Sequence, residues 1–249
     1  MSNWVEQCNE WKHSWDGEKK YFRNWLKDDY FNIYQVIDVL NKYSFSNNIF
    51  ITDTGSASFS LPVNITLKEG QSIISSQSQS DMGWALPASI GVALSAPEKV
   101  PLVLVGDGSF MSNIQELAVI KEYKLPIKIL MLNNNGYLTI RNTQKNFYGN
   151  RVYGVSNTTG LYFPPCDKIS KTFGLNYEKV YYNSGKYSRL ADIFSNNLPY
   201  IVEFMCRENE EIVPSQNFKT IDGKRIQCPL DDMYPFMSDE ELNIERNRI

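Results

Sequence analysis

Short apolar segments alternate with helical segments through most of the chain, and this alternation constrains the fold more than any other feature. Turn-forming residues bound six candidate strands at 49–52, 72–76, 101–107, 127–133, 178–182 and 200–205. Five candidate helices lie at 30–43, 82–95, 112–123, 166–173 and 186–196. Strands that are covered on both faces read as continuous apolar runs, and alternating strands and helices form parallel sheets. The sequence therefore predicts an α/β fold: a doubly wound, mostly parallel six-stranded sheet with helices on both faces.

The two ends differ from this middle, which divides the chain into 1–28, 29–207 and 208–249. Residues 1–28 hold four of the five tryptophans, and Trp4, Cys8, Trp11 and Trp15 are spaced as on one helical face. This helical N-terminal extension either packs on the chain's own core or docks another domain. Residues 208–249 are polar, interrupted by prolines and without periodicity, so we expect an extended tail laid over a surface.

Composition excludes several classes of partner. A net charge of -3 gives no reason to expect nucleic acid or an anionic membrane, and no apolar run is long enough to span a bilayer. Four cysteines without a C-x-x-C pair argue against a zinc site or a disulfide framework and favour the cytoplasm. His13 is the only histidine, which argues against a histidine relay. The expected partner is a small molecule or another protein.

The candidate chemistry lies at the ends of two strands. Asp107 stands between Gly106 and Gly108 after one apolar segment, and the next apolar segment ends in the asparagines 133–135. If the two strands are neighbours, both ends converge at the edge where open α/β sheets bind ligands. A carboxylate, an amide and a carbonyl are the oxygen donors that magnesium prefers. Ser109 and the start of a helix at Ser112 would add donors for an anion.

Other interpretations of this motif fit less well. The stretch "GDGSFM" lacks the third glycine of the dinucleotide fingerprint, and Asn133 stands where a ribose-binding acid is expected. A phosphate-binding P-loop motif is missing from the sequence. A purely structural interpretation makes Gly-Asp-Gly a turn and the asparagines a helix cap, but the pairing of both motifs at a fixed spacing disfavours it.

The pattern GDG, then twenty-four residues, then NN resembles the signature of thiamine-diphosphate enzymes. The surrounding text is similar to the cofactor-binding domain of acetolactate-synthase-type enzymes. The likeness includes "DTGS" (53–56), "DMGWALPASIGVAL" (81–94), the stretch 106–137 and "FGL" (173–175). It extends from Asp53 to Phe204 and implies that the chain binds thiamine diphosphate and Mg²⁺.

The resemblance also implies roles for single residues. Asp107, the Asn134 side chain and the Gly136 carbonyl would bind Mg²⁺, together with two diphosphate oxygens and a water. The backbone of Gly108 and the residues Ser109 and Ser56 would hold the diphosphate.

Two further residues would shape the cofactor's conformation. Met82 matches the bulky apolar residue that wedges under the cofactor and bends it. The backbone carbonyl that contacts the aminopyrimidine falls on Ser80, where the family pattern leads us to expect glycine.

The family's reaction implies a partner. The expected course is decarboxylation of a 2-oxo acid and transfer of the resulting carbanion equivalent to a second carbonyl, with the cofactor as electron sink. In full-length relatives the glutamate that activates the aminopyrimidine comes from a separate pyrimidine-binding domain across a dimer interface. The segment "WVEQCNEWK" resembles the end of the connecting region before the third domain. We therefore assign no catalytic residue here and expect a split subunit or a fragment, inactive alone, in a dimer or tetramer.

Two alternatives to an acetolactate-synthase-like carboligase stay open. The stretch "PLDDMYPFMSDEEL" (229–242) resembles the ending of thiamine-diphosphate proteins from surface-polysaccharide and sugar-nucleotide pathways, which implies a related decarboxylase or lyase. The other alternative is a cofactor-binding subunit without chemistry of its own or a degenerate enzyme, although intact Asp107, Ser109 and Asn134 argue against degeneration.

Overall fold

The computed structural model describes residues 2–14, 29–184 and 187–248 of the 249-residue chain. The chain divides into two compact units, Met1–Asn209 and Glu210–Ile249. None of the helices in the described ranges is both long and apolar enough to cross a bilayer.

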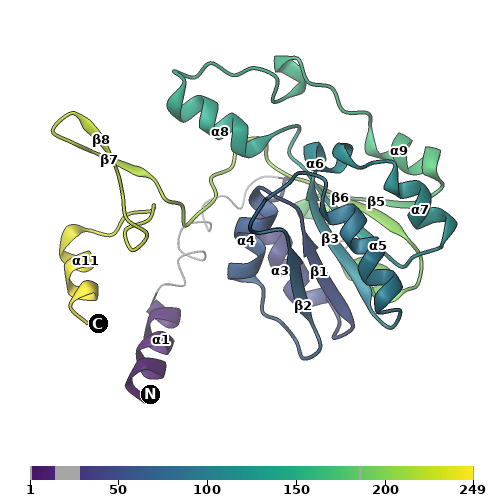
Figure 1. Ribbon diagram of the computed structural model, residues 1–249, viewed down its shortest axis with the longest axis horizontal. Coiled ribbons are helices and arrows are strands. Elements are labelled where there is room, and N and C mark those ends of the chain that lie inside the picture. The colour runs from purple at the N-terminus through teal and green to yellow at the C-terminus, as the bar shows by residue number, and fades with distance from the viewer. Residues whose placement is uncertain (1, 15–28, 185–186, 249) are drawn as a thin grey trace. The chain divides into compact units, whose positions relative to one another are not determined.

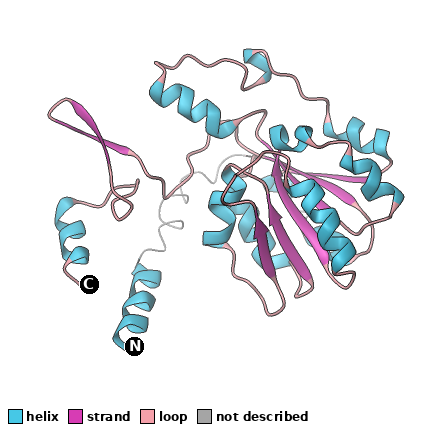
Figure 2. Ribbon diagram, in the orientation of Figure 1, coloured by secondary structure: helices cyan, strands magenta, loops and turns pink. Residues whose placement is uncertain are grey.

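The larger unit is built on a six-stranded sheet (Figure 2). Its strands are β1 (Asn48–Thr52), β2 (Ser72–Ser75), β3 (Val100–Gly106), β4 (Lys128–Asn133), β5 (Asn176–Val180) and β6 (Tyr200–Met205). They lie in the order β2-β1-β3-β4-β6-β5, and every neighbouring pair is parallel. This confirms the predicted doubly wound α/β fold.

Helices cover both faces of this sheet (Figure 1). The described helices of this unit after residue 28 are α3 (Ile33–Tyr43), α4 (Ser56–Asn64), α5 (Ala85–Ser95), α6 (Asp107–Ser112), α7 (Glu116–Glu122), α8 (Leu138–Phe147), α9 (Cys166–Phe173) and α10 (Ser188–Ser195), with 3₁₀ turns η2 (Asn157–Thr159) and η3 (Tyr182–Ser184). One group, α5, α7 and α9, packs over a core that includes Val103, Ile129 and Ile201. The other group, α3, α4 and α10, packs on the opposite face. Because both faces are covered, most residues of the central strands are apolar, although Lys128 in β4 and Glu203 in β6 are also buried.

The structure corrects three of the expected elements. The helix expected at 112–123 begins only at Glu116, as α7, because the backbone of Asn113 leaves the helical region and its side chain donates to the Gly83 carbonyl; a separate helix, α6, ends at Ser112. The strand expected at 178–182 begins earlier, at Asn176, since Gly174 in a left-handed conformation ends α9 just before it. The helix expected at 82–95 begins only at Ala85, after a turn.

The N-terminal residues form helix α1 (Ser2–Ser14). The rings of Trp4 and Trp11 meet edge to face with centroids 5.7 Å apart, so these two residues do share one helical face. Trp15, the fourth residue of that expected stripe, lies outside the described residues.

The smaller unit contains regular structure where the sequence suggests an extended tail. Strands β7 (Phe218–Ile221) and β8 (Lys224–Gln227) form an antiparallel hairpin, and a capping box at Ser238 begins helix α11 (Asp239–Arg246). An ion pair at 2.7 Å joins Lys219 to Asp232 within this unit. The sequence analysis missed this hairpin because a four-residue strand with exposed side chains has almost no hydrophobic periodicity.

Candidate functional site

The candidate site lies where the order of the sheet reverses. From β1 the chain moves outward to β2, and it then returns to the other side of β1 to form β3. Ligands of open α/β sheets bind at the carboxyl ends of the strands on either side of such a switch point. Here these ends are followed directly by Asp53 and Asp107, and the Asp53 N–H donates to the Leu104 carbonyl at 3.0 Å.

Asp107 is the first residue of α6 and is 5% exposed. Its carboxylate accepts hydrogen bonds from the backbone N–H of Gly108 at 2.8 Å and of Gly136 at 2.9 Å. Burial raises the pKa of Asp107 to about 7, although these bonds and the charge of Arg141 act in the other direction. The carboxylate is thus desolvated, and a cation beside it would stabilise its charge.

The turn after β4 contains an unpaired oxygen. Asn134 is 5% exposed, and its Oδ1 accepts no hydrogen bond from any described residue. Buried polar atoms are rarely left unpaired unless a ligand or water completes them. Asn135 has a positive φ of 59°, and Gly136 has a φ of 135°. A Cβ at Gly136 would stand 1.8 Å from the Val155 carbonyl oxygen, so only glycine fits.

Arg141, on α8, holds this turn in place and was missed by the sequence analysis. It is 4% exposed, and its guanidinium donates to the carbonyls of Asn135 at 3.0 Å and Val155 at 3.3 Å, and to that of Glu208. It also reaches the Asn134 carbonyl at 3.4 Å. It is the fourth residue of α8, and no sequence pattern at this position indicates that it binds the turn.

The expected diphosphate-binding residues lie on both sides of the switch point. Ser109, 6% exposed, lies in the first turn of α6, and Ser56 begins α4 directly after Gly55. The N–H of Gly108 donates to the Asp107 carboxylate, and a Cβ on Gly108 would lie 2.2 Å from the Tyr137 ring. The backbone donors expected at Ser112 lie instead at the start of α6, because this separate helix begins at Asp107.

The loop before α5 presents Met82, which is 42% exposed. Asp53 accepts hydrogen bonds at 3.0 Å from the N–H groups of both Gly83 and Ala85, so the loop is tied to the end of β1. Ser80 has a positive φ of 55°, a conformation that favours glycine and that accounts for the glycine expected there. Asp53 is the second residue that the sequence analysis missed, although it is the acid of the "DTGS" motif.

Hydrogen bonds join several of the expected residues to one another. Asp107 is bonded to Gly108 and Gly136, and Asp53 is bonded to Gly83 in the loop of Met82. The Ser80 loop reaches α4, the helix of Ser56, through a hydrogen bond from Gln77 to the Ser58 carbonyl at 3.4 Å.

The donor set suits a magnesium ion that is also bound by a phosphorylated ligand. Among the described residues no three His, Cys, Asp or Glu side chains gather as a metal cluster. Asp107 and Asn134 instead offer one carboxylate and one amide oxygen. Mg²⁺ is typically bound through one or two carboxylates plus substrate phosphates, so the residues present fit this ion. A cavity of about 280 Å³, lined by Asp107, Asn133 and Asn135 among others, adjoins the site.

Comparisons with known proteins agree with this geometry. The model of the thiamine pyrophosphate (thiamine diphosphate) enzyme C-terminal TPP binding domain matches residues 53–204. The acetolactate synthase large subunit of Porphyra purpurea is 36% identical over 141 residues, which are 57% of this chain and 24% of the relative. That of Lactococcus lactis subsp. lactis (strain IL1403) is 27% identical over 187 residues, 72% of this chain and 31% of the relative.

A solved structure shows the same fold. The Rhodococcus jostii RHA1 thiamine diphosphate-dependent 4-hydroxybenzoylformate decarboxylase superposes with a TM-score of 0.65 at 20% identity, over 74% of this chain and 34% of that one. The chain thus spans about a quarter to a third of the length of the proteins that it matches.

Proposed function

The chain belongs to the thiamine pyrophosphate enzymes through their C-terminal cofactor-binding domain, and on this premise we propose that it binds thiamine diphosphate with Mg²⁺ for an acetolactate-synthase-like 2-oxo acid decarboxylase or carboligase. The observation that carries the proposal is the unpaired, buried Oδ1 of Asn134 on the same turn whose Gly136 N–H donates to Asp107. A cation between the two residues would be bound by the Asn134 Oδ1 and by the Asp107 carboxylate.

Each proposed residue does a simple task. The Asp107 carboxylate, the Asn134 amide and the Gly136 carbonyl hold the metal ion, and Arg141 keeps their turn from opening. Ser56, Ser109 and the N–H of Gly108 hold the diphosphate. To do so, the Gly108 N–H gives up its hydrogen bond to Asp107.

The other end of the cofactor meets the loop before α5. Met82 supports the bent form of the cofactor, and the Ser80 carbonyl receives the aminopyrimidine. Asp53 positions both through its bonds to the loop backbone. The bound cofactor supplies an electron sink for the carbanion that a 2-oxo acid leaves on decarboxylation.

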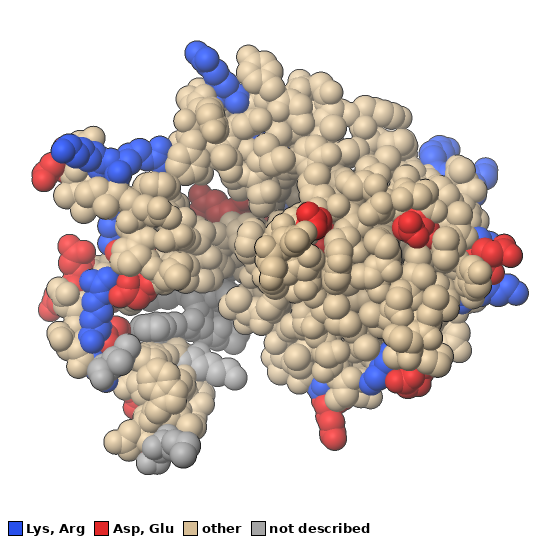
Figure 3. Space-filling model, viewed as in Figure 1, with Lys and Arg blue, Asp and Glu red and all other residues tan. Residues whose placement is uncertain are grey.

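We propose that a pyrimidine-binding domain in trans completes the site and brings the activating glutamate. Helix α4 follows the "DTGS" turn, helix α5 follows the loop of Ser80 and Met82, and neither helix contains a charged residue. Their exposed side chains include Phe59, Val63 and Leu94, and Figure 3 shows a mostly uncharged surface over these helices. Exposed apolar side chains on helices without charged residues mark interaction surfaces, which supports a partner that covers these helices in a dimer or tetramer.

The cofactor proposal is tested by calorimetric titration of thiamine diphosphate into the purified chain with Mg²⁺. Asp107→Asn should weaken binding by more than the roughly tenfold that loss of a supporting partner costs. Asp167→Asn, which removes one exposed acid from α9, is the charge-matched control and should bind as the unaltered chain does. Equal affinity in all three proteins would refute the metal assignment.

The requirement for a partner has its own test. The chain mixed with Mg²⁺, thiamine diphosphate and pyruvate should release no carbon dioxide, and release without a partner would contradict the proposal. Cofactor binding together with inactivity after reconstitution with a pyrimidine-binding domain would instead favour the non-catalytic subunit.

A decarboxylase or lyase of surface-polysaccharide or sugar-nucleotide biosynthesis is the second candidate. The segment 229–242 favours it, and this segment lies in the smaller compact unit, where it leads from the hairpin into α11. Product analysis of the reconstituted enzyme separates the two, because only the carboligase forms acetolactate from pyruvate.

A further inference from the structure

A buried glutamate lines the cavity beside the proposed metal site and has no role assigned so far. Glu203 is in β6, is 2% exposed, and stands in register between Met131 of β4 and Lys179 of β5. It lines the cavity that also reaches Asp107. A carboxylate in such a place is unfavourable unless it is paired and hydrogen-bonded, so its partners matter.

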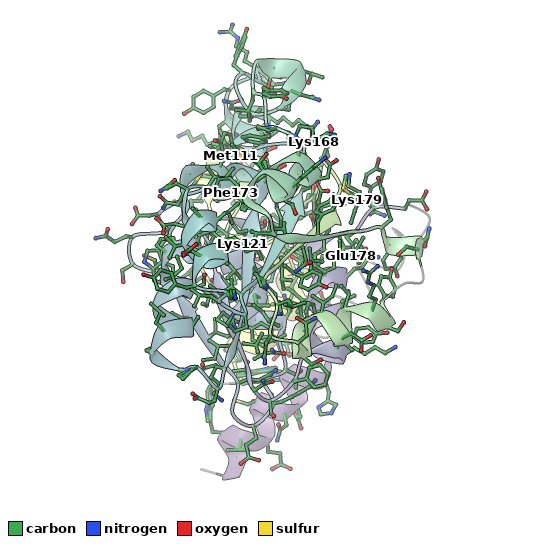
Figure 4. The ribbon with its side chains drawn as sticks, turned by 90° about the vertical axis from the view of Figure 1, so that its right-hand side faces the viewer. Met111, Lys121, Lys168, Phe173, Glu178 and Lys179 are labelled. Atoms are coloured by element: carbon green, nitrogen blue, oxygen red, sulfur yellow. The ribbon has the colours of Figure 1, made fainter. Side chains whose placement is uncertain are left out.

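The two oxygens of Glu203 have different partners. Oε2 lies 3.3 Å from the Lys179 ammonium and accepts a hydrogen bond from the Tyr177 hydroxyl, so the edge strand β5 holds this oxygen. In Figure 4 Lys179 lies on the side of β5 nearer Lys168 of α9, away from Glu178. Oε1 accepts from the Asn133 side-chain amide at 2.6 Å, so this oxygen reaches the end of β4.

Glu203 thereby decides which way the Asn133 amide faces. An ionised carboxylate only accepts hydrogen bonds, so the NH₂ end of Asn133 must point toward it. The amide oxygen of Asn133 then points the other way and accepts from the Asn135 N–H at 3.1 Å. That bond supports the left-handed conformation of Asn135, which lies between Asn134 and Gly136.

We propose that Glu203 is a positioning residue for the divalent cation, acting through Asn133 on the turn that carries Asn134 and Gly136. The inference rests on the proposed function, since it presumes a cation at Asp107 and Asn134. Glu203 fixes the turn at the N–H of Asn135, whereas Arg141 fixes it at its carbonyls. Two charged groups of opposite sign therefore hold the same four-residue turn from different elements.

The test measures Mn²⁺ binding to the full chain in the presence of thiamine diphosphate, from the electron paramagnetic resonance signal of free Mn²⁺. Glu203→Met removes the acceptor for Asn133 and should weaken Mn²⁺ binding by about 10-fold or more, as loss of outer partners of metal ligands does. Glu203→Gln keeps an oxygen that can accept from Asn133 and should therefore retain most of the Mn²⁺ affinity of the unaltered chain. Lys179→Met leaves Oε1 untouched and is the matched control.

The thermal midpoint separates positioning from simple structural support. Removing one partner of a buried ion pair usually destabilises a protein, so Glu203→Met and the control Lys179→Met should both lower the midpoint, whereas only Glu203→Met should weaken Mn²⁺ binding. Asn133→Leu breaks the same relay at its other end, and the double variant with Glu203→Met should bind no more weakly than either single one.

Two results would overturn this inference but not the proposed function. One is Mn²⁺ binding by Glu203→Met as tight as by the unaltered chain. The other is a loss of Mn²⁺ affinity in Lys179→Met equal to that in Glu203→Met. Additive losses in the double variant would also contradict a shared relay. An unaltered chain that binds no Mn²⁺ would overturn the proposed function, and this inference with it.

Discussion

The Asp107 carboxylate accepts a hydrogen bond from the Gly136 N–H at 2.9 Å, and this bond ties the end of β3 to the turn after β4. The two residues are 29 positions apart in sequence. Because the bond fixes the distance between two strand ends, any change that moves either end should be felt at the proposed cation site.

Gly108 should tolerate no side chain, whereas Gly106 should. A Cβ at Gly108 would lie 2.2 Å from the Tyr137 ring, but one at Gly106 would meet no described atom within 4 Å. Gly108→Ala should lower the free energy of unfolding by about 1–3 kcal/mol, as overpacking does, and should weaken cofactor binding. Gly106→Ala should leave both nearly unchanged. Urea unfolding and calorimetry measure the two effects, and equal stability of the variants would contradict the prediction.

Arg141 should require its guanidinium rather than its charge alone. Its fork reaches carbonyls on three separate segments, which a lysine ammonium cannot match. Arg141→Lys should weaken Mg²⁺-dependent binding of thiamine diphosphate by about tenfold. The exposed Arg151→Lys serves as the control. Unchanged affinity in Arg141→Lys would show that the turn needs no such clamp.

Asp53 should be needed as a carboxylate. Its Oδ1 accepts from Thr54 and Gly83 and its Oδ2 accepts from Ala85, so either orientation of an amide would point an NH₂ group at a backbone donor. Asp53→Asn should therefore cost about 1–3 kcal/mol of stability. Asp81→Asn, an exposed acid of the same loop, should cost much less. The two variants are compared by thermal and urea unfolding, and matching losses would rule out the special role of Asp53.

Lys128 should make stability depend on pH. Its side chain is fully buried at the start of β4, where it donates to Asn196 and to the Leu198 carbonyl, and burial lowers its pKa from 10.5 to about 7. Between these values the unfolded chain binds more protons than the native one, so the free energy of unfolding should rise with pH from about 7 toward 10.5. The slope from this group approaches about 1.4 kcal/mol per pH unit.

Urea unfolding at several pH values measures this slope. Lys128→Met should flatten it, and the exposed Lys171→Met should not. A slope that survives in Lys128→Met would assign the dependence to other groups.

The amino-acid sequence by itself determined the sheet and the identity of the central motif. Nearly continuous apolar runs predicted the strands, because a strand covered on both faces is mostly apolar. Asp107 and the asparagines 133–135 were recognised at the ends of two expected strands, and the roles of Asn134 and Gly136 were implied by the resemblance to thiamine-diphosphate enzymes.

Only the tertiary structure decided what supports these residues. Arg141, Asp53 and Glu203 act through hydrogen bonds to groups 7, 30 and 70 positions away, and no local pattern encodes such pairs. The break at Asn113 likewise depends on a carbonyl 30 residues earlier. Local periodicity reports which face of an element is buried, whereas the partners of a buried polar group depend on which strand ends the fold brings together.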